Sequence, residues 1–166
     1  MPVVRVYVPA GRAELDALAD GGALAAAPDA PRIAYAVTPG LSALGGGADV
    51  EELEYAAFCD AAAAASAVRA RPGDRRVVVA ADADPASVLP PGQPGSVASV
   101  VLLVAALPLD RVASLHVDGQ AADEPVTDAR VGDAHGVNEL GTDEMMWHDV
   151  TELDEVRRLL SPPATS

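Results

Sequence analysis

DVEELEYAAFCDAAAAASAVRAR, residues 49–71, is the stretch that decides the fold, because it is the longest helical pattern in the chain. Asp49 stands at the N-cap position, and Glu52 follows at the spacing of a capping box. Acidic residues fill the first turn and arginines the last, which suits the helix dipole. Pro72 and Gly73 then end the pattern. The stretch predicts one long central helix.

One face of this helix is apolar. At 100° per residue it contains Val50, Leu53, Ala57, Ala61, Ala64 and Val68. The small alanines allow the helix to lie close against a sheet. Glu54 falls inside the apolar arc, so its carboxylate must be hydrogen-bonded, raised in pKa, extended past the interface or paired with an arginine such as Arg5 or Arg76. Cys59 is expected opposite this face, and as the only cysteine it excludes an intramolecular disulfide.

Short apolar runs flank the central helix. Residues 3–8, 33–38 and 75–81 predict strands, of which the first and the third are expected to be buried, and residues 11–20 predict a helix between the first two. Strands and helices that alternate in this way are typical of crossovers that build a parallel sheet. Further elements are expected downstream: strands at 96–107 and 114–117, a loop at 133–143, an edge strand at 144–151 and a helix at 152–160.

The fold class that follows is α/β. We expect one domain over residues 1–160, with a mainly parallel central sheet of about five strands and helices packed on it. Residues 161–166 are expected to form a frayed tail. Half of the 166 residues are hydrophobic but only 3% are aromatic, so the core must consist of Val, Leu and Ala.

The net charge of −14 excludes several classes of partner. Nucleic acid and anionic membrane surfaces would be repelled by this field. A protein partner or a second copy of the chain remains as the expected partner. The N-terminal residues lack the pattern of a signal peptide, and the most apolar run, 97–107, is shorter than a membrane span. The expected location is the cytoplasm.

Five residues form a candidate site under the parallel-sheet hypothesis. Ligands bind such sheets at the carboxyl ends of the strands, where Asp82 and Asp84 follow the third strand and Glu54 lies early in the central helix. His116 and Asp118 join them only if the fifth strand runs parallel to the others. Glu54, Asp82, His116 and Asp118 are the catalytic candidates. The candidates for metal ligands are Glu54, Asp82, Asp84 and Asp118, an oxygen-rich set suited to Mg²⁺, Mn²⁺ or Ca²⁺.

Ordinary structural chemistry offers another interpretation of these residues. Aspartates after a strand commonly start turns, and a histidine on a strand commonly lies on a sheet face. The chain carries no GxSxG elbow and no phosphate-loop motif. We therefore expect no cofactor, with a divalent metal as the alternative.

Six segments follow one another along nearly the whole chain: VRVYVPA (4–10), AYAVTP (34–39), EELEYAAF (51–58), RRVVVAAD (75–82), LDRVASLHVD (109–118) and MMWHDVTEL (145–153). In this order they resemble an uncharacterised family of small acidic actinobacterial proteins whose function is unknown. The resemblance implies a single-domain cytoplasmic protein and supplies no activity, cofactor or catalytic residue. Where such sequences tend to carry a second acid after HVD, this chain has Gly119, which weakens a carboxylate pair there.

Two functional hypotheses follow. The first is a non-catalytic domain that binds a partner or associates with itself, since catalytic motifs are lacking and the late strand carries Met145, Met146 and Trp147. The alternative is a divalent-metal-dependent hydrolase or a small-ligand binder that uses the carboxylates at the sheet edge. Whether the protein is an enzyme stays open at this point.

Overall fold

The computed structural model describes residues 2–68, 74–92, 97–119 and 145–160. Its centre is a seven-stranded sheet in which every neighbouring pair of strands is antiparallel. In spatial order the strands are β5 (Val88–Leu89), β6 (Val100–Leu103), β3 (Arg32–Ala36), β1 (Val4–Ala10), β4 (Val77–Ala83), β8 (Val112–Asp118) and β9 (Met145–Asp149). A smaller antiparallel sheet pairs β2 (Ala23–Leu24) with β7 (Leu107–Pro108).

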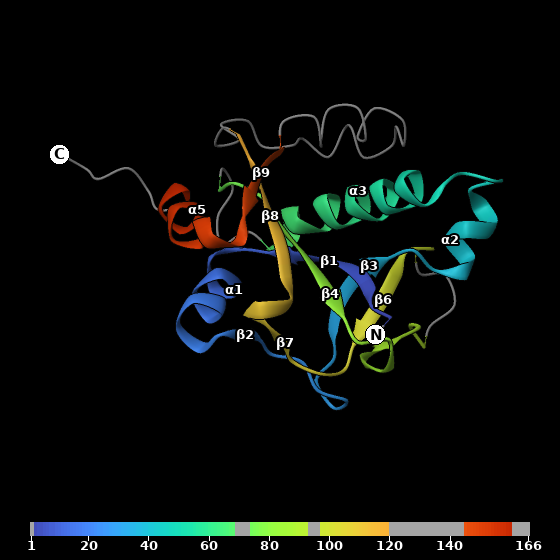
Figure 1. The fold of residues 1–166 in the computed structure, drawn as a ribbon, viewed down its shortest axis with the longest axis horizontal. Helices are drawn as coiled ribbons and strands as arrows, with labels where there is room; N and C mark the ends of the chain where they lie inside the picture. The colour runs from blue at the N-terminus through green and yellow to red at the C-terminus, as the bar shows by residue number, and fades with distance from the viewer. Residues whose placement is uncertain (1, 69–73, 93–96, 120–144, 161–166) are drawn as a thin grey trace.

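Helices cover both faces of the large sheet (Figure 1). The long helix α3 (Val50–Val68) packs on β1, β3 and β4. The opposite face is covered by α1 (Arg12–Asp16), the π-helical turn η1 (Ala17–Gly21) and α5 (Leu153–Leu159). The remaining short elements are α2 (Pro39–Leu44) and the 3-10 turns η2 (Pro85–Ser87), η3 (Leu109–Arg111) and η5 (Val150–Glu152).

Strand β4 is buried on both faces. Val77 and Val79 point into the core under α1 and α5, whereas Val78 and Ala80 point toward α3. Two covered faces explain why its sequence is apolar throughout rather than alternating. The predicted burial of this strand is confirmed.

The expectation of a mainly parallel sheet of about five strands is wrong. After β1 the chain passes through α1 and η1 but re-enters the sheet at the end where β1 left it, so that Tyr7 lies opposite Tyr35 in an antiparallel pair. Strands β3 and β4 do share a direction, yet β1 lies between them. The alternation of strands and helices along the sequence predicts the order of these elements but not the direction of the strands in the sheet. Because helices cover both faces, antiparallel strands acquire the unbroken apolar character that was expected of parallel ones.

The N-terminus of α3 is formed as its sequence predicts. The backbone N–H of Glu52 donates to Asp49 Oδ1 at 2.9 Å, and the backbone N–H of Asp49 donates to Glu52 Oε2 at 3.1 Å. This reciprocal pair is a capping box. Residues 69–71 of the expected helix, the loop at 133–143 and the tail at 161–166 lie outside the described residues.

The buried face of α3 differs from the predicted one. Val50 and Val68 are exposed at its ends, and Cys59 is buried instead of facing away from the core. The reason is Phe58, whose ring packs edge-on against Tyr7 at a centroid distance of 5.9 Å and so turns this side of the helix toward the sheet. The buried residues of α3 are Leu53, Ala57, Phe58, Cys59, Ala61, Ala62 and Ala65.

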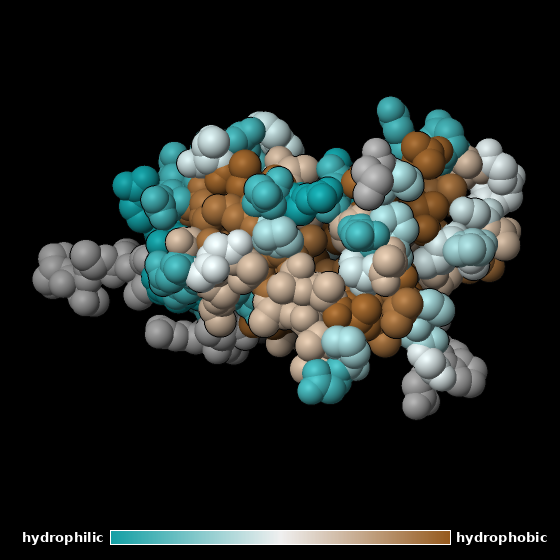
Figure 2. All heavy atoms as spheres, turned by 60° about the horizontal axis from the view of Figure 1, so that its bottom comes forward, coloured by the Kyte–Doolittle hydropathy of each residue, from teal (hydrophilic) through white to brown (hydrophobic). Residues whose placement is uncertain are grey.

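The surface carries apolar patches among its charges. Figure 2 shows hydrophobic residues gathered in patches that hydrophilic residues border. Within the described residues, none of the helices is long and apolar enough to cross a membrane.

Candidate functional site

The candidate residues lie at two opposite ends of the sheet. Strand β8 runs antiparallel to β4, so Asp118 lies beside Arg76 at the start of β4. Asp82 lies at the other end of β4, opposite Arg5. Six positions along a strand separate these two ends, a span of about 20 Å. The condition under which His116 and Asp118 would join Asp82 is therefore not met.

Asp118 is held in a buried ion pair. Its carboxylate accepts hydrogen bonds from the backbone N–H of Arg76 at 2.8 Å, from Arg76 Nε and from Arg76 Nη2 at 2.8 Å. Only 9% of the Asp118 side chain is exposed. Arg75 Nη1 adds a hydrogen bond to the Asp118 carbonyl at 3.0 Å. These bonds tie the end of β8 to the start of β4.

His116 is packed against α3. Its ring centroid lies 4.8 Å from that of Phe58, and its Nε2 lies 3.1 Å from Ser114 Oγ. Burial first, and the nearby His148 second, lower the pKa of His116. The ring is therefore neutral at pH 7 and serves as packing surface between β8 and α3.

The lowered pKa of His116 predicts a loss of stability in acid. Between the pKa of the folded protein and about 6.5, the value for an unperturbed histidine, the unfolded chain binds more protons. The free energy of unfolding therefore reaches its full value above about pH 6.5 and falls as the pH drops toward the folded pKa. We expect His116→Gln to flatten this fall in urea titrations between about pH 5 and pH 7.5, an interval that spans the pKa of an unperturbed histidine. An unchanged pH profile would contradict the assignment, since the other two histidines remain in both proteins.

Two of the other candidates, Asp82 and Glu54, interact with Arg5. Arg5 Nε donates to Asp82 Oδ1 at 2.7 Å, with each side chain about one-third exposed. This hydrogen bond first, and the charge of Glu54 to a smaller extent, raise the pKa of Arg5. Burial, followed by the Glu54 charge, also raises the pKa of Tyr7 to about 12. The structure thus brings Glu54 and Asp82 to the same arginine.

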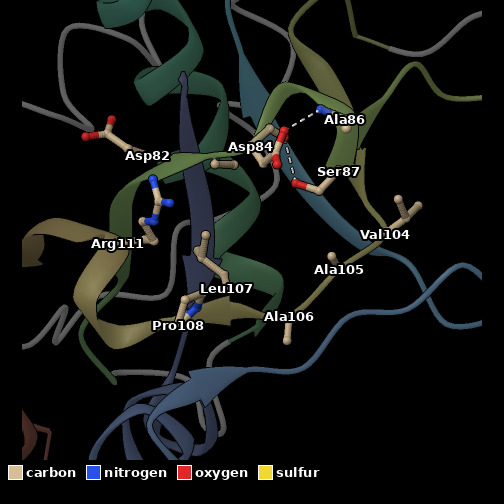
Figure 3. A pocket seen from close by; sticks show the side chains of 11 residues that line it. Asp82, Asp84, Ala86, Ser87, Val104, Ala105, Ala106, Leu107, Pro108 and Arg111 are labelled. Atoms are coloured by element: carbon tan, nitrogen blue, oxygen red, sulfur yellow. Dashed lines mark hydrogen bonds between the residues drawn. The ribbon is translucent and has the colours of Figure 1, made fainter. Parts of the chain in front are cut away.

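Asp82 and Asp84 line a cavity of about 380 Å³ at the end of β4 (Figure 3). Arg111 of η3 also lines it and is the one cation among the lining residues. No motif in the sequence pointed to Arg111 as part of a site. Only the antiparallel register of β8 against β4 brings the start of β8 to this end of the sheet.

A grouping that could hold a metal ion is not found in the described part of the chain: no three His, Cys, Asp or Glu side chains come together there. The oxygen atoms of Asp118 are engaged by Arg76 and those of Asp82 partly by Arg5. The metal site stays a prediction from sequence, with its expected ligands divided between two ends of the sheet.

Strand β9 differs from these charged positions because it exposes large apolar side chains. It is the last strand of the sheet, and in the described residues it pairs only with β8. Met146 is 54% exposed and Trp147 61% exposed. The register sets Trp147 opposite His116, on the face that α3 covers. Tyr55, Phe58, His116 and Trp147 thereby form a row from α3 to β9, which we call the aromatic strip.

Comparison with known proteins finds one relationship. Residues 4–156 match the model of a family of unknown function, DUF6912. No curated protein and no solved structure matches the chain. The match confirms the expected membership of an uncharacterised family, and an actinobacterial origin stays a prediction.

Proposed function

The chain belongs to the DUF6912 family, and because the function of that family is unknown, we propose a function from the surface itself: a non-catalytic domain that binds a protein partner at the outer edge of β9. The observation that carries this proposal is the exposure of Met146 and Trp147 on the last strand of the sheet. Large apolar side chains on a protein surface commonly mark sites of interaction.

The edge of β9 is suited to pairing with another chain. Edge strands present unpaired backbone groups, and proteins usually protect them with charged residues or prolines. Within β9 the sequence is MMWHD, which contains no proline and whose one carboxylate, Asp149, stands at the end. An extended segment of a partner could therefore add to β9 as a further strand, with backbone hydrogen bonds supplying affinity.

The aromatic strip supplies side-chain contacts for the same partner. Trp147 and Tyr55 are both more than half exposed. Tyr55 lies against Phe58 and Phe58 against His116, and Trp147 stands opposite His116 in the strand register. Tryptophan and tyrosine are enriched among the residues that dominate binding energy at interfaces. The strip gives β9 a rigid apolar flank, because its central rings are fixed between α3 and β8.

Charge favours a basic partner over a second copy of this chain. Two copies would each carry a net charge of −14, whereas a basic segment is attracted by this field. Near β9, the backbone N–H and hydroxyl of Thr151 donate to Asp149 and lower the pKa of its carboxyl, so Asp149 is ionised at neutral pH. Glu152 adds a second carboxylate beside it. These two acids can pair with arginine or lysine side chains of the added strand.

A double substitution, Met146→Gln with Trp147→Gln, tests this proposal. A fluorescent peptide of alternating arginine and valine serves as the probe, and its anisotropy reports binding. We expect binding to weaken roughly thirtyfold in the variant, the equivalent of about 2 kcal/mol for the loss of a central aromatic anchor. The thermal midpoint should stay close to that of the parent protein, because exposed substitutions change stability by only about 0.5 kcal/mol.

Ile33→Gln is the matched control, since Ile33 is 55% exposed on β3, away from β9. It should leave the affinity for the peptide unchanged. Equal affinity in the parent protein and the double variant would refute the docking role of β9. Sedimentation of the parent as a dimer that the double variant dissociates would instead identify a second copy as the occupant.

A further inference from the structure

The cavity at the end of β4 carries opposite charges on its two sides. Figure 3 shows Arg111 on one side, and Asp84 with Ser87 on the other. Apolar groups, among them Ala83, Val104 and Leu107, complete the lining. A volume of about 380 Å³ lies within the range of known small-molecule sites.

Arg111 is available to a ligand. Its side chain is exposed, and within the described residues no carboxylate lies within salt-bridge distance of its guanidinium. A guanidinium presents a planar fork of N–H donors that matches a carboxylate. The anionic group of a ligand would therefore be bound at this side of the cavity.

Asp84 offers an acceptor at the other side. Its Oδ1 accepts from the backbone N–H of Ala86 at 2.9 Å, which caps η2 and fixes the side chain in place. In the described structure its second carboxylate oxygen has no hydrogen-bond donor. Ser87 is held in turn, because its hydroxyl donates to the Asp84 carbonyl at 2.7 Å. A cationic group of a ligand would be bound here.

Asp82 plays a different part. Asp82 and Asp84 extend in different directions from the end of β4 (Figure 3), and Asp82 Oδ1 is already engaged by Arg5. The pairing with Arg5 balances the charge of Asp82, so the cavity retains one uncompensated cation and one uncompensated anion, Arg111 and Asp84.

From this arrangement we infer that the cavity is a binding site for a small zwitterion, with an ammonium group and a carboxylate at opposite ends of a short aliphatic chain, as in an ω-amino acid. The carboxylate pairs with Arg111, the ammonium group pairs with Asp84, and the chain lies against the apolar lining. Inorganic phosphate is disfavoured because the uncompensated carboxylate of Asp84 would repel a dianion. A lone divalent cation is disfavoured because Arg111 would repel it.

Isothermal titration calorimetry with a series of ω-amino acids of increasing length tests the inference. We expect one length to bind best, with a dissociation constant on the order of 1 mM, as suits a ligand of few atoms. The amine and the carboxylic acid of the same chain length, each carrying only one of the two charges, should bind about tenfold more weakly or not at all, because each loses a charged hydrogen bond.

Two variants locate the site, each with a control. Arg111→Gln and Asp84→Asn should each weaken binding of the best zwitterion about tenfold or more. Asparagine can still accept from Ala86, so the cap of η2 is retained. Arg158→Gln and Asp110→Asn, at exposed positions outside the cavity lining, should leave binding unchanged.

Circular dichroism and thermal midpoints must show that all four variants are folded. An absence of measurable heat for every member of the series with the folded parent protein would overturn the inference. Binding that survives Arg111→Gln, or a preference for the amine alone, would overturn it equally.

Discussion

Replacing Asp118 with asparagine is expected to lower the free energy of unfolding by about 3 kcal/mol or more, the range found when one partner of a buried ion pair is removed. The carboxylate accepts hydrogen bonds from both the backbone and the guanidinium of Arg76, and neither side chain is more than 16% exposed. Asparagine keeps the shape but presents one oxygen where two are engaged, and it removes the negative charge that faces the buried guanidinium of Arg76.

Asp82→Asn provides the matched comparison. It removes the same atoms from the Arg5–Asp82 pair, whose side chains are 36% and 33% exposed. Solvent screens this pair, so the expected loss is about 1 kcal/mol or less. Urea denaturation followed by circular dichroism measures both. Equal and small losses would show that Asp118 has no special structural role and would restore it as a candidate for function.

The elements that the sequence predicted well are those with local signals. The capping box at Asp49 and the apolar run of β4 depend on residues close in the chain, and both are present. The edge strand expected at 144–151 is β9, which does lie at the edge of the sheet. Local chemistry likewise explains Asp84, which caps η2 in the manner expected of an aspartate at a turn.

Strand direction could not be predicted, because it depends on where the chain re-enters the sheet. The strand expected at 96–107 shows the same limit. Val100–Leu103 and Leu107–Pro108 belong to two different sheets, but the residues between them, 104–106, are Val-Ala-Ala and carry no turn signal. The direction of β8 also determines which candidate residues lie together. It places His116 and Asp118 at one end of the sheet and Arg111 at the other.

The sequence also could not predict which side chains the buried charged groups would pair with. One expectation for Glu54 was a pairing with Arg5 or Arg76. The charge of Glu54 does act on Arg5, but the hydrogen bond of Arg5 goes to Asp82. Arg76, the other arginine considered, pairs with Asp118. Both pairings follow from the register of distant strands, Arg5 with Asp82 across β1 and β4 and Arg76 with Asp118 across β4 and β8.

Close packing of α3 against the sheet provides the second large effect. Ala61 is fully buried and faces Val78, Ala80 and Tyr7 in the core between α3 and the sheet. Ala61→Leu inserts three further carbon atoms into this contact. Overpacking of this kind costs about 3 kcal/mol at the upper end of the usual range. We expect the thermal midpoint to fall by about 6–12 °C for a protein of this size.

Ala63→Leu is the control, because Ala63 lies two residues along the same helix and is exposed. Alanine and leucine have nearly equal helix propensities, so this variant should differ from the parent by about 0.5 kcal/mol or less. The difference between the two variants isolates packing from propensity. If Ala61→Leu were as stable as Ala63→Leu, α3 would be free to move away from the sheet, and the alanine run would not be what sets their separation. A large loss confined to Ala61→Leu would show that the alanines, the first feature visible in the sequence, hold α3 at the distance that lets Phe58 reach both Tyr7 and His116.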